Sequence, residues 1–135
     1  MIRPVLAGHL KKGDGMGDKI IKGYKGFNKD MKCRDFQFAE GEEYTTDKAV
    51  ACESGFHACE YPLDVFYYYD PANSIYHKVE QSGKIDRHNG DTKIASTKIK
   101  IGASINLNAM IKAAIQFIYD RTDNKKEIND DRSVA

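Results

Sequence analysis

Residues 92–120 read TKIASTKIKIGASINLNAMIKAAIQFIYD, and the spacing of their apolar positions changes once. Over 97–105 every second residue is apolar or small, which is the period of a β-strand. Lys98 and Lys100 occupy alternate positions, so the strand turns lysines to solvent or to a partner. We expect one face of this strand to be buried and the other to be basic.

The second half of the same stretch has the spacing of an amphipathic helix. Asn106 is a favourable N-cap, and the helix is expected over about 107–120. Its broad apolar face is expected to pack on the sheet, although its width also suits a homodimer. The face comprises Leu107, Met110, Ile111, Ala114, Ile115 and Ile118.

Upstream, short apolar runs between turn residues predict antiparallel strands. The tripeptide ESG, whose Gly55 suits the positive φ of a bulged turn, is expected to join 49–52 and 56–59 in a hairpin. In the strand over 74–86, His77 is expected to be half-exposed. The other expected strands cover 20–27, 32–38 and 44–46.

A short helix is expected directly after that hairpin, over about 62–69. Pro62 suits the first helical position, and Asp64 lies in the first turn, where the positive end of the helix dipole favours a carboxylate. Asp70 and Pro71 end the helix. Its predicted apolar stripe is Leu63, Phe66 and Tyr67.

Together these elements predict an α+β fold, in which short antiparallel strands form a twisted sheet with both helices packed on it. The 135 residues suffice for one domain. We expect a flexible leader at 1–18, a single domain at 19–120 and a polar tail at 121–135.

The composition is that of an ordinary globular protein, with 41% hydrophobic and 30% charged residues. No apolar run approaches the roughly 18 residues of a membrane helix, and no signal peptide is evident. We therefore expect a cytoplasmic protein. Its three cysteines are an odd number, which indicates reduced thiols.

His57 and Cys59 invite a catalytic interpretation, because they share one face of the expected strand and Cys59 precedes a helix start. A thiol with a lowered pKa beside a histidine base is the minimal nucleophile pair. No orienting third residue accompanies them, and the cysteines lack the close spacing of a zinc knuckle. We predict no catalytic residue, no metal site and no cofactor.

Charge is segregated along the chain, which reads basic, acidic, basic. Residues 1–32 carry eight Lys and Arg against three Asp, residues 40–80 carry nine Asp and Glu against two Lys, and residues 84–112 carry six Lys and Arg against two Asp. The simplest interpretation is that these charges solvate the surface. The alternative is an acidic surface that meets a basic groove on a partner.

Several motifs resemble a small domain of phage and mobile-element proteins. They are GYKGFNKDMKCRDFQF, CESGFHACEYPLDVFYYYD, HKVEQSGKID and TKIASTKIKI, which occur in one order over about residues 20–105. Members of that family include anti-CRISPR proteins that inhibit Cas9. The resemblance implies a counter-defence protein that binds a Cas9-type effector stoichiometrically in the bacterial cytosol and needs no active site.

Under this interpretation, the acidic middle of the chain and its neighbouring tyrosines meet a nucleic-acid-handling groove of the effector. The competing surface is the strand with Lys98 and Lys100, which would favour RNA or DNA instead. The predicted partner-binding residues are Glu40, Glu42, Glu43, Glu53, Glu60, Tyr61, Asp64, Tyr67, Tyr68, Tyr69 and Asp70.

Two alternatives belong to other classes of function. The order of GYKGF, an arginine and a strand before an aromatic helix resembles ADP-ribosyltransferases, with Arg34, His57, Tyr68 and Glu80 as candidate site residues. The other alternative is an oligomeric sponge for a nucleotide immune signal, with pockets between its subunits.

Overall fold

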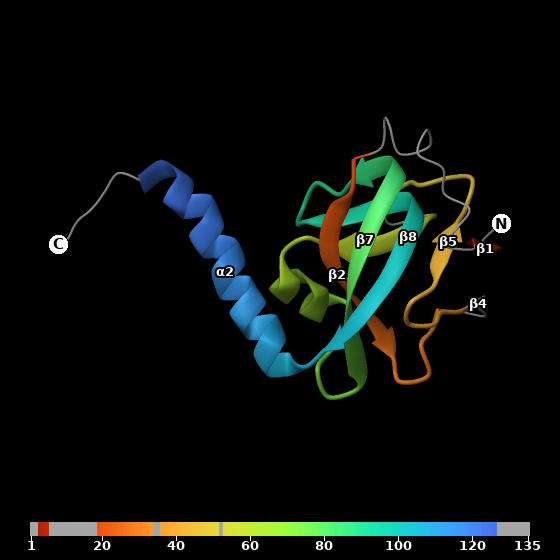
Figure 1. The fold of residues 1–135 in the computed structure, drawn as a ribbon, viewed down its shortest axis with the longest axis horizontal. Helices are drawn as coiled ribbons and strands as arrows, with labels where there is room; N and C mark the ends of the chain where they lie inside the picture. Colours follow the sequence, from red (N-terminus) through yellow and green to blue (C-terminus); the bar gives the residue numbers. More distant parts are fainter. Residues whose placement is uncertain (1–2, 6–18, 34–35, 52, 127–135) are drawn as a thin grey trace.

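The computed structural model describes residues 3–5, 19–33, 36–51 and 53–126, and it confirms the α+β class. Its strands form a six-stranded antiparallel sheet and a separate two-stranded one. In the view of Figure 1, β2, β7 and β8 lie between α2 on the left and β5 on the right. The elements are β1 (Arg3–Val5), β2 (Ile21–Asn28), β3 (Lys32–Cys33), β4 (Phe36–Gln37), β5 (Glu43–Thr45), β6 (Phe56–Cys59), the 3₁₀ helix η2 (Pro62–Tyr67), β7 (Ser74–Arg87), β8 (Lys93–Ile105) and α2 (Leu107–Lys126).

Both ends of the predicted domain differ from expectation. Within the expected leader, β1 pairs with β5, while residues 1–2 and 6–18 lie outside the described residues. At the other end, α2 continues to Lys126, so the expected tail begins as helix. Residues 127–135 lie outside the described residues.

The large sheet closes on itself. The long strands β7 and β8 pair with each other; the other edge of β8 pairs with β6 and then β5, and the other edge of β7 pairs with β2. One residue pair, Tyr24 with Cys59, joins β2 to β6, so β8, β6, β2 and β7 form a ring. A Cβ atom at Gly23 would lie 2.7 Å from the carbonyl oxygen of Cys59, so this closure requires glycine.

The main core fills the inside of this ring, because all four ring strands contribute to one buried cluster. Phe38, directly after β4, and Tyr44, within β5, add their rings to this cluster, and Phe38 lies 5.4 Å from Phe27, centre to centre. The cluster comprises Phe27, Phe38, Tyr44, Phe56, Ala58, Val79, Ile99 and Ile101.

Polar side chains inside the ring have hydrogen-bond partners. The Lys25 ammonium donates to the carbonyl of His57 at 2.7 Å, and the Gln81 amide donates to backbone carbonyls of β6 and β8. The expectation that His77 is half-exposed is wrong, because His77 is 2% exposed. It shares the inner face of β7, and its Nδ1 donates to the carbonyl of Gly102 at 2.8 Å.

A second cluster lies on the outer face and holds η2, which differs from the predicted helix. A 3₁₀ helix repeats every three residues, so Pro62 and Val65 are buried. The predicted stripe had the 3.6-residue period, and it wrongly included Tyr67, which is 78% exposed. Pro62 does occupy the helix start. The buried members of the second cluster are Cys59, Val65, Tyr76 and Met110.

Two predicted strand arrangements are wrong. The segment 32–38 is not one strand, because β3 and β4 pair with each other. The hairpin between 49–52 and 56–59 is wrong, since β6 pairs with β8 and β2, and the described residues before it make one isolated bridge, from Val50 to Ser54. The predicted alternation along β6 is confirmed, because Phe56 and Ala58 lie in the main core and Cys59 lies in the second cluster.

The helix α2 begins as predicted, with Asn106 Oδ1 accepting a hydrogen bond from the Ala109 amide at 2.8 Å. It packs against η2 and the outer face through Met110 and Ala114, which are 0% and 2% exposed. The rest of the predicted apolar face remains exposed. No helix in the part of the chain that the structure describes is long and apolar enough to cross a membrane.

Candidate functional site

The predicted partner-binding residues fall into separate regions of the fold. Glu40, Glu42 and Glu43 lie in and before β5, which is on the far side of β7 and β8 from η2 in Figure 1. Glu53 lies in the turn before β6. We use the term η2 surface for the remaining residues, which follow one another in and around the 3₁₀ helix. They are Glu60, Tyr61, Asp64, Tyr67, Tyr68, Tyr69 and Asp70.

The first part of the η2 surface is tied to the turn between β7 and β8. Asp64 Oδ2 accepts hydrogen bonds from the Thr92 amide at 3.0 Å and from the Thr92 hydroxyl at 2.8 Å. The same hydroxyl oxygen accepts from the Tyr61 amide at 2.9 Å. Asp64 therefore holds η2 in place, and its carboxylate is already engaged within the molecule.

Asp91 ties the second part of η2 to the same turn. Its carboxylate accepts from the Tyr68 hydroxyl at 2.5 Å and from the Lys93 amide at 2.9 Å, and it lies 2.8 Å from His88 Nδ1. Burial opposes ionisation of Asp91, but these hydrogen bonds outweigh it and lower the pKa of the carboxyl below its ordinary value. The Lys93 ammonium lies 4.0 Å from the Tyr68 ring centre. Tyr68 thus has a fixed position.

The sequence analysis missed Asp91 and Thr92. Both lie in the short turn before β8, where polar residues are the ordinary content of a turn, so composition does not distinguish them. Their partners are distant in sequence: Tyr68 and Asp91 are 23 positions apart, and Asp64 and Thr92 are 28.

The remaining tyrosines of the η2 surface divide into packed and exposed side chains. The Tyr61 ring lies 5.1 Å from that of Phe117 on α2, and the Tyr69 side chain lies against Gly26, where a Cβ atom would come within 2.6 Å of it. Tyr67 is 78% exposed and Tyr68 is 42% exposed. Tyr67 and Tyr68 are therefore the tyrosines of the η2 surface that are most accessible to a partner protein.

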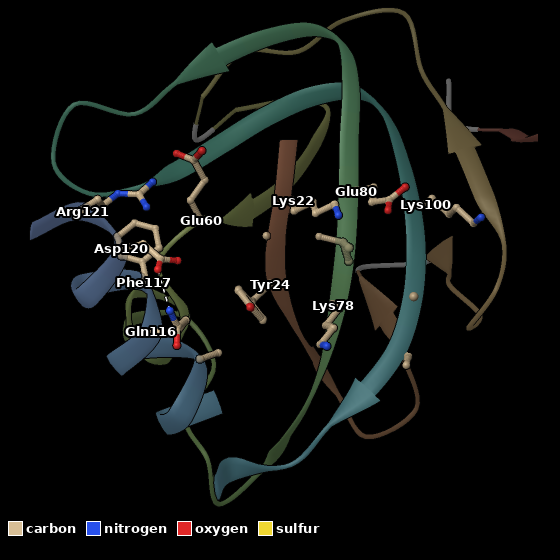
Figure 2. Close-up of a pocket in the computed structure, with 15 residues that line it drawn as sticks. Lys22, Tyr24, Glu60, Lys78, Glu80, Lys100, Gln116, Phe117, Asp120 and Arg121 are labelled. Carbon is tan, nitrogen blue, oxygen red and sulfur yellow. Dashed lines mark hydrogen bonds between the residues drawn. The ribbon is translucent and has the colours of Figure 1, made fainter. Parts of the chain in front are cut away.

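Beside the η2 surface, a groove of about 680 Å³ separates the outer face of the sheet from α2 (Figure 2). Its floor comes from β2, β7 and β8, with Tyr24 at its centre, and its wall comes from α2. Burial raises the pKa of the Tyr24 hydroxyl above its ordinary value. The charged residues that line the groove are Lys22, Lys78, Lys100, Arg121, Glu60, Glu80 and Asp120.

Several of these charged groups already have partners in the chain. Glu60 accepts a hydrogen bond from Arg87 at 2.9 Å, and Asp120 accepts one from Gln116 at 2.6 Å. The Arg121 guanidinium lies 3.5 Å from the ring centre of Phe117. These contacts stiffen the helical wall and the rim of the groove.

Charges of alternating sign cross the sheet in register. Lys22 on β2 lies opposite Glu80 on β7, and Glu80 lies opposite Lys100 on β8. Lys100 in turn lies opposite Glu43 on β5. A row of this kind complements a protein segment of mixed charge, whereas a nucleic-acid backbone would meet a carboxylate at every second position.

Comparison with known proteins adds the family. A family model described as a domain of unknown function, DUF7666, matches residues 21–113. The chain belongs to the DUF7666 family. The match runs from the start of β2 into α2, so it includes the whole η2 surface. No curated protein and no solved structure matches the chain.

In this DUF7666 domain, the basic strand face predicted from the sequence is only partly basic. Lys98 and Lys100 do lie on the side of β8 away from the core, and Lys100 is exposed. Lys100 stands between two carboxylates in the row, and Lys98 lies opposite Thr45 and Ser82. The face therefore lacks the continuous positive charge that a phosphate backbone requires.

The residues of the alternative enzyme site contribute to different parts of the domain. Arg34 lies outside the described residues. Tyr68 is bonded to Asp91, and Glu80 lines the groove, to which neither His57 nor Tyr68 contributes. Among the described members of this set, Glu80 therefore lines the groove without His57 or Tyr68.

His57 and Cys59 do not form an activated nucleophile pair. Burial raises the pKa of the Cys59 thiol to about 12, with further contributions from Asp91 and Asp64, so the thiol lacks the lowered pKa that the catalytic interpretation of this pair needs. Burial and the nearby ammonium groups lower the pKa of His57 to about 4. Within the described ranges, no three His, Cys, Asp or Glu side chains converge as metal ligands would.

Proposed function

We propose that this DUF7666 domain is a phage- or mobile-element-encoded counter-defence protein that binds a Cas9-type effector stoichiometrically in the bacterial cytosol. The observation that carries the proposal is the exposure of Tyr67 and Tyr68, 78% and 42%, in a segment that also holds the carboxylates of Glu60 and Asp70. Exposed aromatic side chains are frequent anchors of protein interfaces. Neighbouring carboxylates complement a basic groove that handles nucleic acid.

The way in which the η2 surface is held supports binding. The Thr92 bonds fix Asp64, the Asp91 bond fixes Tyr68, and the Tyr76 hydroxyl donates to the carbonyl of Tyr69 at 2.7 Å. Groups that are already ordered lose little conformational entropy when a partner docks. The surface therefore has the preorganised character of an inhibitor.

The charge row across the sheet favours a protein partner over free nucleic acid. Because neighbouring charges in the row have opposite signs, their electrostatic potentials cancel over a distance comparable to the Debye length, which is about 8 Å at physiological ionic strength. The η2 surface is acidic, because its residues include the carboxylates of Glu60, Asp64 and Asp70 and no Lys or Arg; Arg87 pairs with Glu60. An effector that exposes a basic channel satisfies both conditions.

The test is size-exclusion chromatography with light scattering of the protein mixed with guide-loaded Cas9, at two salt concentrations. We expect a stable complex that weakens at the higher salt. Tyr67→Ala should weaken it strongly, whereas Tyr119→Ala, a tyrosine of similar exposure on α2, should not. No complex at either salt, or equal losses from the two substitutions, would contradict the proposal.

Charge reversals separate the acidic regions. Glu60→Lys should weaken the complex more than Lys98→Glu, and a larger effect of Glu42→Lys would move the interface to the β5 side. The enzymatic alternative is tested by incubating the partner with this protein and NAD. We expect the mass of the partner to be unchanged, and a gain of one ADP-ribose would contradict plain binding.

A further inference from the structure

The side of α2 that faces away from the domain carries a row of large apolar side chains. These five residues, which we call the α2 row, are 42% to 63% exposed. Nine large hydrophobic residues are exposed in the described part of the chain, and five of them belong to this row. The row comprises Leu107, Ile111, Ile115, Ile118 and Tyr119.

The row is a continuous stripe. At 3.6 residues per turn, its members fall within an arc of about 120° around the helix axis. Met110, Ala114 and Phe117, which face the domain, occupy the adjoining arc. The charged residues Lys112 and Asp120 fall outside the row. The described part of the domain thus covers one half of a wide apolar face and leaves the other half exposed.

We propose that the α2 row is the interface between two copies of this chain. A stripe without charge is complemented by another apolar stripe, and the described surface has no second row of this length outside α2. A two-fold axis places the same patch on both sides of the interface, which is the commonest arrangement of soluble dimers. Ile111, Ile115 and Ile118 are spaced by four and then three, the repeat with which two helices pack along a seam.

The size of the row sets the strength of the dimer. Four half-exposed aliphatic side chains and one tyrosine present on the order of 400 Å² of apolar surface. Two copies therefore bury on the order of 800 Å² before flanking residues are counted, which lies in the range of weak, reversible interfaces. The sequence that directly follows α2, residues 127–135, contains Ile128 and Val134 as its large apolar residues, too few to match the five of the α2 row.

The test uses the full chain alone, so its outcome is independent of any effector. Analytical ultracentrifugation over a range of concentrations should show a monomer–dimer equilibrium. Ile115→Glu, in the middle of the row, should weaken association at least tenfold. Ile20→Glu is the control, because Ile20 is also an exposed isoleucine, 58%, but lies directly before β2 and not on α2; it should leave association unchanged. Circular dichroism melts check that both variants fold.

A cross-link keeps the proposal testable if Ile115→Glu disturbs folding. Under mild oxidation, Ile115→Cys should form a disulfide-linked dimer, and Ile20→Cys should remain at the level of the parent chain. A monomer at every concentration, or equal cross-linking of the two cysteine variants, would overturn the proposal.

Discussion

Gly23→Ala tests whether the closed ring of strands is the element that limits the stability of the domain. The new Cβ atom would lie 2.7 Å from the carbonyl oxygen of Cys59, and β6 cannot move aside easily because β8 holds its other edge. Gly23 is not among the glycines with positive φ, so alanine adds no backbone strain at this position.

The magnitude follows from two opposing terms. Forcing a methyl group into a packed contact costs about 1–3 kcal/mol. Replacing glycine by alanine returns about 0.4–1 kcal/mol by restricting the unfolded chain. We therefore expect a net loss of about 1–2 kcal/mol in the free energy of unfolding, which corresponds to a fall in Tm of roughly 3–10 °C.

The assay is thermal and urea unfolding followed by circular dichroism, with Gly90→Ala as the matched control. A Cβ atom at Gly90 would have only the ring of His88 within 4 Å, at 3.2 Å, and no backbone atom, so the contact is much looser than the one at Gly23. The control should stay within about 0.5 kcal/mol of the parent. If Gly23→Ala unfolds at or above the temperature of the parent, the strand ring is not closed by this contact and the reasoning is refuted.

Three further predictions concern single side chains. Thr92→Val should lower the free energy of unfolding, measured by urea denaturation, by about 1–3 kcal/mol, because Asp64 loses a donor and the Tyr61 amide loses an acceptor. An unchanged free energy of unfolding would contradict the role of Thr92 in holding η2 against the sheet. Cys59 should resist iodoacetamide at pH 8 in the folded protein and react after denaturation, as peptide mass mapping would show, since burial raises the pKa of its thiol to about 12. Folding lowers the pKa of His57 from 6.5 to about 4, so His57 binds a proton more tightly in the unfolded chain. The free energy of unfolding should therefore not depend on His57 above about pH 6.5 and should fall as the pH drops from 6.5 to 4. If His57 causes this fall, His57→Gln should make it shallower.

The local patterns of the sequence were sufficient for much of the fold. Alternation identified β8, the cap at Asn106 identified the start of α2, and Pro62 identified the start of η2. Each of these features depends on residues within one or two turns of the chain, which is the range over which periodicity and capping act.

Features that depend on distant partners were missed or misassigned. A hairpin around Gly55 was the nearest pairing for β6, but β8 and β2 occupy both of its edges. His77 was expected to be half-exposed, as in a sheet with one face in solvent, whereas the ring buries His77, Val79 and Gln81 on the inner face of β7. The ties from Asp91 and Thr92 to η2 link residues more than 20 positions apart, so no local pattern contains them.

The single pair between Tyr24 and Cys59 also sets how the domain opens. Within the ring, the ladders of β7 with β8 and β2 are long, so the ring opens most easily at the β2–β6 seam. Opening there frees two strand edges at once, and unpaired edges are templates for a strand from another chain. We expect amide hydrogen exchange to be faster at Tyr24 and Cys59 than along β7. Such a difference would identify the seam as the point at which a strand from another chain inserts.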